Sequence, residues 1–289
     1  MDYLLAVGAV LIWGLVTIPI KLARARGRLG VMVSMPTGLA ALALAVLATG
    51  QAGLPDASWR DWLFIGVTGL CQFAVGGVAY YEAVQYAGVT VTAPITRLMP
   101  LLVVLSAVLL GSTRFSWLIL LAAGLTVLGG IVLSRGLQHP NQPHSRSDMR
   151  KGIVLAVLTA VLWAGGNLAV DQVSAEVTRV QVTLYSLALG TVFYWVFMAA
   201  RGRLSRLRRL TRRDWLCYAV HGVLSYAVAY LLLFESIDRL GVSRATVLIG
   251  SWPVAAVVVA VAVFREHVNV LIGSGIVLMI GGAVLAAVC

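Results

Sequence analysis

The sequence predicts an all-α integral membrane protein with ten transmembrane helices, arranged as two inverted five-helix repeats. Three observations predict this fold class. The 289 residues are 60% hydrophobic and 11% charged, with a mean hydropathy of +0.94. Long apolar runs recur along the chain, and its two halves align with each other. Soluble domains carry roughly 25% charged residues, so the composition excludes a soluble globular protein.

The length of a membrane-crossing helix defines the expected spans. A hydrocarbon core of about 30 Å needs about 20 apolar residues. That length fits ten segments, near residues 3–22, 29–49, 62–84, 91–111, 115–134, 152–171, 180–200, 215–237, 243–264 and 268–288. The runs lack the alternation of a membrane β-barrel. The first run has no basic segment before it and no small-x-small cleavage site, so we expect it to remain as the first helix.

The internal repeat divides the chain into residues 1–134 and 152–289, joined by a loop at 135–151. Moving the segment that starts at Glu82 by 153 positions places it on the segment that starts at Glu235. Pro100 then coincides with Pro253. Each half contains five spans, an odd number, so the second half must enter the membrane from the opposite side.

The distribution of positive charge supports this inversion. Loops that follow odd-numbered spans hold 16 of the 22 Lys and Arg residues, loops that follow even-numbered spans hold five, and Arg97 lies inside a span. The positive-inside rule therefore predicts cytoplasmic odd loops and both termini outside a plasma membrane, which in a bacterium is the inner membrane. The net charge of +11 thus reflects topology, and we expect no nucleic-acid partner.

Several features together resemble the EamA-type members of the drug/metabolite transporter superfamily. They are the two five-helix repeats, Trp13 and Trp163 midway along each first helix, and the stretches Tyr81-Glu82…Gly88-Val89 and Phe234-Glu235…Gly241-Val242. The resemblance covers nearly the whole chain. It implies a secondary transporter that exports amino acids, toxic metabolites or drugs by alternating access; relatives exchange nucleotide sugars or phosphorylated sugars. The resemblance implies cytoplasmic termini, as in many ten-helix members. The charge distribution here instead favours termini outside the membrane.

Arg97 is the leading candidate for substrate contact. It lies seven residues into the fourth span, well inside the predicted bilayer. A charge in hydrocarbon costs at least about 2.5 to 3.5 kcal/mol, so such residues are usually functional. A carboxylate or phosphate of the cargo is the natural partner. The alternative is that Arg97 pairs with Glu82 or reaches the interface.

Further candidates are polar or aromatic residues near the middle of the spans, where the two repeats should meet. Residues at i, i+4 spacing share one helix face. The sixth span carries Thr159, Trp163, Asn167 and Asp171 at this spacing, and the eighth carries Tyr218, Gly222, Tyr226, Tyr230 and Phe234. Helix packing or an interfacial belt is the alternative for the aromatic stripe. The expected substrate-binding set is Arg97, Trp163, Asn167, Tyr80, Tyr81, Tyr226, Tyr230, Ser251 and Trp252.

Three titratable residues are candidates for proton coupling: Glu82, Glu235 and His221. The two glutamates lie near span ends, where a solvated or capping carboxylate is the alternative. The three cysteines share no metal-ligand spacing, so we expect no metal and no cofactor.

The sequence therefore predicts a secondary transporter that exports a small metabolite across the bilayer, as a monomer or weak dimer. An amino acid, possibly aromatic, is the leading cargo, because its carboxylate suits Arg97 and its side chain suits the aromatic residues. An organic or phosphorylated anion is the alternative. An intramembrane enzyme would need a nucleophile with a base, or a metal set, within the spans, and the sequence shows neither.

Overall fold

The protein is a bundle of ten membrane-spanning helices. A computed structural model describes residues 2–23, 28–48, 55–137, 146–265 and 267–288. Within these residues all regular structure is helical, and ten segments are long and apolar enough to cross a membrane. They are Asp2–Leu22, Arg28–Ala48, Trp59–Gly88, Val91–Leu109, Trp117–Gly136, Arg146–Asp171, Arg179–Ala200, Arg212–Leu240, Val242–Val263 and Val270–Val288. The predicted fold class is confirmed. The loop expected at 135–151 is shorter than predicted, because residues 146–151 are helical. Residues 138–145 of that loop lie outside the described part of the chain.

Each repeat is built from helices that break at similar places. The first contains α1 (Asp2–Leu15), α2 (Thr17–Leu22), α3 (Arg28–Ala48), α4 (Trp59–Thr68), the π-helix η1 (Gly69–Ala74), α5 (Val75–Thr96), α6 (Met99–Leu109) and α7 (Trp117–Gly136). The second contains α8 (Arg146–Asp171), α9 (Arg179–Ala200), the 3₁₀-helix η2 (Leu204–Arg209), α10 (Arg212–His221), the π-helix η3 (Gly222–Ala229), α11 (Tyr230–Leu240), α12 (Val242–Ile249), α13 (Trp252–Phe264) and α14 (Val270–Val288).

The backbone irregularities of the two repeats recur at the offset of 153. A capping box starts α4 at Ser58 and α10 at Thr211, and the π-helices begin at Gly69 and Gly222. The third span then ends at Gly88, with φ of 76°, and the eighth ends directly before Gly241, with φ of 78°. Such positive φ values are readily adopted by glycine alone. The two halves therefore share local structure as well as sequence.

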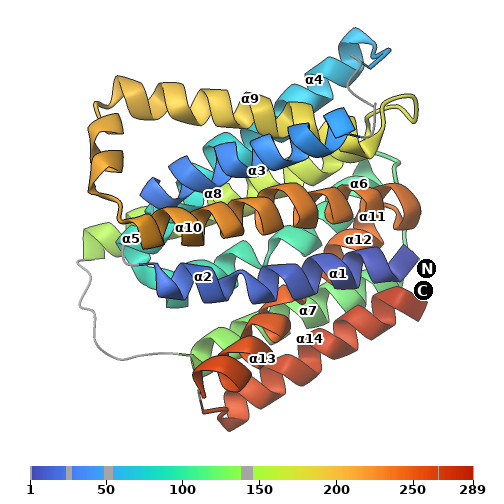
Figure 1. Cartoon of the computed structure of the whole chain (residues 1–289). Helices are drawn as coiled ribbons and strands as arrows, with labels where there is room; N and C mark the ends of the chain where they lie inside the picture. The colour runs from blue at the N-terminus through green and yellow to red at the C-terminus, as the bar shows by residue number, and fades with distance from the viewer. Residues whose placement is uncertain (1, 24–27, 49–54, 138–145, 266, 289) are drawn as a thin grey trace.

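The repeats lie in opposite directions across the bundle. Asp2, where α1 begins, lies 3.4 Å from Arg239 at one end of the bundle. Asp148, near the start of the counterpart α8, lies beside Arg28 and Arg203 at the other end. Figure 1 shows both chain ends on the side of the molecule where α9 begins. We call the end that carries Arg28, Arg203 and Arg206 the basic end, and the end that carries Asp2 and Arg239 the opposite end.

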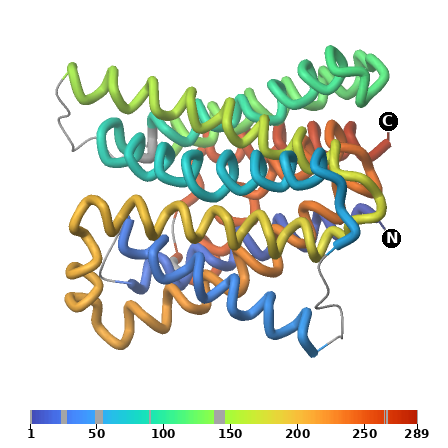
Figure 2. Tube along the Cα trace, turned by 90° about the horizontal axis from the view of Figure 1, so that it is seen from above, coloured from blue at the N-terminus to red at the C-terminus, as the bar shows by residue number. Residues whose placement is uncertain are grey.

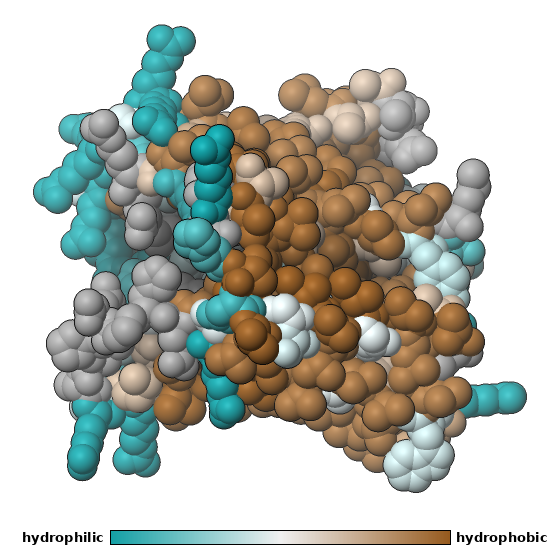
Figure 3. All heavy atoms as spheres, turned by 90° about the horizontal axis from the view of Figure 1, so that it is seen from below, coloured by the Kyte–Doolittle hydropathy of each residue, from teal (hydrophilic) through white to brown (hydrophobic). Residues whose placement is uncertain are grey.

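The outer surface fits a membrane. Figure 3 shows a broad apolar face, with hydrophilic side chains gathered mainly at one end of the bundle. Equivalent helices of the two repeats make equivalent contacts: α3 packs against η3, and α9, the counterpart of α3, packs against η1. Figure 2 shows α3 beside α9 in one layer and α5 beside α8 in the other.

Glycines allow the fifth and tenth spans, α7 and α14, to pack closely along their length. A Cβ atom on Gly282 would lie 2.7 Å from the Ala122 carbonyl oxygen and 2.5 Å from Thr126 Oγ1. A Cβ on Gly275 would lie 2.6 Å from the backbone nitrogen of Leu133. In a bilayer, where lipid is as apolar as leucine, such close backbone approach is a main source of helix association.

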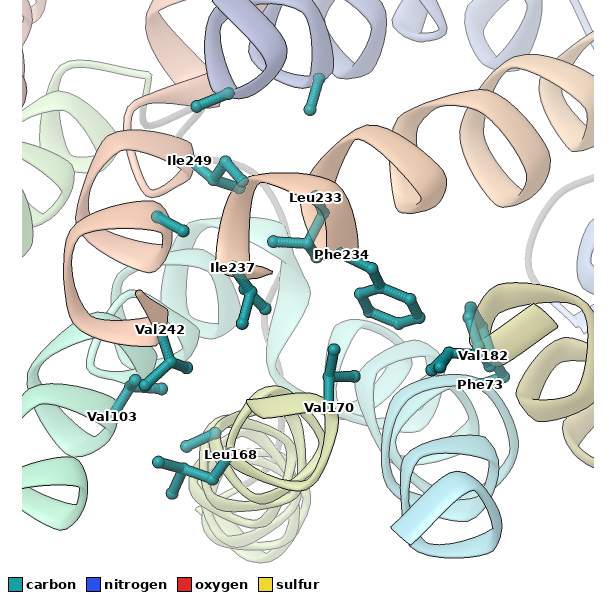
Figure 4. Close-up of a cluster of buried hydrophobic side chains, with 14 of the residues drawn as sticks. Phe73, Val103, Leu168, Val170, Val182, Leu233, Phe234, Ile237, Val242 and Ile249 are labelled. Atoms are coloured by element: carbon teal, nitrogen blue, oxygen red, sulfur yellow. The ribbon is translucent and has the colours of Figure 1, made fainter. Parts of the chain in front are cut away.

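An apolar cluster fills the bundle toward the opposite end (Figure 4). Phe234 and Ile237 of α11 are 0% and 2% exposed, and Val170 of α8 and Val242 of α12 are both 0% exposed. Figure 4 shows Phe234 directed toward Phe73 and Val182, and Val242 directed toward Val103. Side chains from the two repeats thus interlock at this end.

We predict that Gly282→Leu lowers the free energy of unfolding by about 1 to 3 kcal/mol, the usual cost of overpacking. The matched control is Gly281→Leu, because a Cβ on Gly281 meets nothing within 4 Å. Thermal unfolding of both variants in detergent measures the difference. Equal stability of the two variants would contradict the close α7–α14 contact.

Candidate functional site

A cavity of about 220 Å³ lies between the two repeats. Most of the residues predicted from the sequence to bind substrate line it. These are Tyr80, Tyr81, Arg97, Trp163, Asn167, Tyr226, Tyr230 and Trp252, and the proton-coupling candidate His221 lines it too.

Three of the predicted residues lie elsewhere. The hydroxyl of Ser251 donates to the carbonyl of Leu248 at 2.6 Å, and Ser251 is absent from the cavity lining. Glu82 forms an ion pair with Arg28 at the basic end. Glu235 lies 3.6 Å from Arg239, one turn along its own helix. The structure therefore does not bring the two glutamates together with the cavity.

Broken helices bring polar residues to the centre of the bundle. The fourth span is interrupted between α5 and α6, and Arg97 is the first residue after α5. The ninth span is interrupted in the same way at Gly250, between α12 and α13. Pro100 and Pro253 follow the two breaks and lie in the first turn of the next helix, where proline is tolerated. Non-helical backbone at membrane depth occurs where it is buried in protein or lines a cavity.

Arg97 is a buried cation without a carboxylate partner in the described part of the chain. Its residue is 8% exposed, and its guanidinium carbon lies 4.4 Å from the centre of the Trp252 ring. This is a cation–π contact between the repeats. Gly130 makes room for the side chain, since a Cβ there would lie 2.8 Å from Arg97 Cγ. Because Glu82 pairs with Arg28, the expected alternative of an Arg97–Glu82 pair is wrong.

The lining of the cavity contains no Asp or Glu among the described residues. Arg97 therefore dominates its electrostatics. Burying a cation without a counter-charge is costly. An anionic group of a ligand would remove that cost, which makes Arg97 the natural place for a carboxylate or phosphate.

A polar bridge connects the third and sixth spans beside Arg97. The Gln72 side-chain amide donates to Asn167 Oδ1 at 2.6 Å, and Asn167 Nδ2 lies 3.4 Å from Met99 Sδ. Both Gln72 and Asn167 are almost fully buried. The bridge fixes the orientation of two amides at the cavity wall. The sequence reasoning missed Gln72.

Trp13 and Trp163 occupy equivalent positions but differ in hydrogen bonding. The Trp13 indole N–H donates to Ser225 Oγ at 3.0 Å. The Trp163 indole N–H is buried and has no acceptor among the described residues. Ser225 is related to Gln72 by the offset of 153, so comparing polar residues between the halves could have identified both as site residues.

Aromatic rings form the remaining wall of the cavity. Tyr226 and Tyr230 stack with centroids 6.0 Å apart and planes inclined by 9°. Trp13 meets Tyr230 edge-on at 5.4 Å, and Tyr80 lies 5.3 Å from Trp163. In an ordinary α-helix, residues four apart drift by about 40° per step, so a long i, i+4 stripe would wind around the helix. The π-helix η3 widens the turn and keeps the eighth-span stripe facing inward.

His221 is held by a hydrogen-bond chain to the second span. Ser34 Oγ donates to the carbonyl of Tyr218 at 3.0 Å and lies 2.9 Å from His221 Nδ1. Because a hydroxyl has one hydrogen, Ser34 must accept from Nδ1–H. In the neutral ring the other nitrogen, Nε2, is then an acceptor on a side chain that lines the cavity.

No group of three or more His, Cys, Asp or Glu residues that could hold a metal ion occurs in the described ranges. The site therefore consists of one guanidinium, a few neutral polar groups and aromatic rings. Such a set can bind and orient a small molecule with an anionic group and an apolar or cationic portion.

Comparisons with known proteins agree with the architecture. The sequence model of the EamA-like transporter family matches residues 1–135 and again residues 150–288. The chain belongs to this family, and it is a membrane transporter of the drug/metabolite type. No curated protein matches the sequence. One solved structure, titled "Crystal structure of protein", is similar with a TM-score of 0.81 and 22% identity, over 99% of this chain and 97% of that one. That likeness supports the fold.

The unequal bonding of the two tryptophans predicts unequal effects of the same substitution. Trp13→Phe removes a hydrogen bond, whereas Trp163→Phe removes a buried donor that has no acceptor. An unsatisfied buried group costs about 1 to 3 kcal/mol. We therefore expect the Trp163→Phe variant to be more stable than the Trp13→Phe variant by about that amount in thermal unfolding. Equal losses would mean that the Trp163 N–H has an acceptor.

Proposed function

We propose that the protein exports amino acids, including aromatic ones, by alternating access, with Arg97 as the residue that binds the cargo carboxylate. The observation that carries this proposal is the lone guanidinium in the wall of the central cavity. Guanidinium–carboxylate hydrogen bonds are short, strong and often bidentate. Only substrates with an anionic group can use them.

The size of the cavity favours a small cargo. Ligand pockets usually measure about 300 to 1,000 Å³, and this cavity of about 220 Å³ lies below that range. A nucleotide sugar would not fit in such a space. An amino acid suits it better.

The aromatic wall suits the rest of an amino acid. An ammonium group near the face of Trp or Tyr gains about 0.5 to 2 kcal/mol from cation–π attraction. Tyr226, Tyr230 and Trp13 offer such faces, and His221 Nε2 offers a hydrogen-bond acceptor. An apolar or aromatic side chain would pack among the same rings.

Alternating access is supported by the asymmetry of the bundle. The apolar cluster around Phe234 and Ile237 packs at the opposite end (Figure 4). Tyr81 and Ile20, which line the cavity, lie toward the basic end of their spans. The two repeats are inverted, so exchanging their conformations would transfer access to the opposite end.

An organic anion is the second candidate cargo. The supporting observation is that the described cavity lining offers no carboxylate to balance an ammonium group. A keto acid or another apolar carboxylate would use Arg97 and the aromatic rings without that need.

Transport assays in proteoliposomes test the role of Arg97. We expect the purified protein to exchange labelled L-phenylalanine, and Arg97→Ala to reduce this exchange by about 10- to 100-fold, the equivalent of about 1.5 to 3 kcal/mol for a charged hydrogen bond. Arg97→Lys should retain part of it.

Two analogues separate the candidate functions in the same assay. Preference for phenylpyruvate over phenylalanine would favour the organic anion. Uptake of phenethylamine, which has no carboxylate, with equal rates in the wild type and Arg97→Ala, would rule out both anion-based functions.

We also propose that the basic end faces the cytoplasm and that both termini lie outside, because arginine-rich loops are costly to translocate. Cysteine labelling in a background without native cysteines tests this. We expect Asp2→Cys to react with an impermeant thiol reagent in intact cells, and Arg208→Cys to react only after permeabilisation. The reverse pattern would establish the opposite orientation.

A further inference from the structure

We propose that a second anion-binding site, centred on Arg28, lies at the basic end and receives the cargo carboxylate before it reaches Arg97. The proposal rests on the proposed function for the identity of its ligand. Its physical basis is a second cavity together with an arginine whose hydrogen-bonding capacity is not filled.

The second cavity, which we call the mouth cavity, has a volume of about 580 Å³. It lies between α3, α5, α8 and α9 and the segment that follows α9. Its lining is Arg28, Leu29, Glu82, Gln85, Tyr86, Asp148, Met198, Arg203 and Arg206. On α5, Glu82 directly follows Tyr80 and Tyr81, which line the central cavity. The two cavities therefore adjoin along one helix.

Arg28 is positioned in the mouth cavity with donors to spare. Its backbone carbonyl accepts a hydrogen bond from the Tyr194 hydroxyl at 3.1 Å, which ties α3 to α9. Its side chain is 15% exposed and pairs with Glu82 through Nη2. Its Nε–H is buried and has no acceptor within the described residues. A guanidinium has five N–H donors in a fork that matches a carboxylate, so a second anion can be accommodated.

Arg179 provides a comparison, because its guanidinium nitrogens all donate hydrogen bonds. It is the first residue of α9 and lies at the other end of the bundle from Arg28 of α3. Its Nε and Nη2 donate to Asp238 Oδ1 at 2.9 and 2.5 Å, and its Nη1 donates to the carbonyl of Val170 at 3.2 Å. Here α9 packs directly against α11. An arginine whose role is to join helices is therefore fully bonded in this protein, and Arg28 is not.

The charge of the mouth cavity favours an incoming anion. Three arginines line it against two carboxylates, Glu82 and Asp148. A cleft with an excess of one charge raises the local concentration of ligands of the opposite charge. In this arrangement Glu82 competes with the cargo for Arg28: the incoming carboxylate binds the donors that Glu82 leaves unused, and the negative charge of Glu82 opposes its approach.

Competition by Glu82 gives the proposal a distinctive test. In the phenylalanine exchange assay, Arg28→Gln should raise the half-saturating concentration about tenfold. Glu82→Gln should lower it at least threefold, because it frees Arg28 for the cargo. If the ion pair were purely structural, both substitutions would weaken transport in the same direction and reduce thermal stability, and the proposal would be overturned.

A binding measurement separates this site from the central one. Purified Arg97→Ala protein, which lacks the central cation, should still bind labelled benzoate, and Arg28→Gln added to it should abolish that binding. Equal benzoate binding by both proteins would overturn the proposal. The result does not depend on transport, so a wild-type protein that fails to exchange any amino acid would refute the proposed function and leave this test intact.

Lipid composition distinguishes a cargo carboxylate from a lipid phosphate. The opposite effects of Arg28→Gln and Glu82→Gln should persist in liposomes of phosphatidylcholine alone. If they occur only when phosphatidylglycerol is present, the site binds a lipid headgroup, and the proposal is overturned.

Discussion

The requirement that every backbone polar group be satisfied in lipid governs this structure. Spans through the hydrocarbon must be helical, and any interruption must be enclosed by protein. The breaks at Arg97 and Gly250 are therefore placed where the two repeats meet, together with the π-helices η1 and η3. The cavity lies at these interruptions. The constraint that makes the rest of each span regular thus concentrates irregular backbone, and the polar groups it presents, in one central place.

Divergence between the repeats gives the cavity its chemistry. At the offset of 153, Arg97 corresponds to Gly250, and Gly77 corresponds to Tyr230. The first repeat contributes a cation where the second has a glycine, and the second contributes an aromatic ring where the first has a glycine. All four residues line the cavity, so the two repeats give it different groups. Two repeats with similar backbones therefore enclose a cavity that has a guanidinium and a wall of aromatic rings.

The spans, the inversion and the buried position of Arg97 could be predicted from the sequence, because hydrophobic length, charge asymmetry and a charge in an apolar run are strong local signals. The partner of Glu82 could not. Glu82 meets Arg28 across a long sequence separation, and no pattern indicated that contact. Ser251 bonds back to the preceding turn, where the Leu248 carbonyl accepts both its hydroxyl and its backbone N–H. Gln72 was overlooked because a single amide in an apolar helix gives little signal until its partner, Asn167, is in place.

The paired π-helices also carry information about the history of the chain. They begin at Gly69 and Gly222, at the same register, although the residues within them, Gly-Leu-Cys-Gln-Phe-Ala and Gly-Val-Leu-Ser-Tyr-Ala-Val-Ala, have largely diverged. A π-turn is a rare departure from the α-helix. Two independent origins therefore explain poorly why it occurs at the same register in both halves. The widened turn therefore belonged to the ancestral five-helix unit before duplication. Each repeat thus brings one widened turn to the wall of the same cavity.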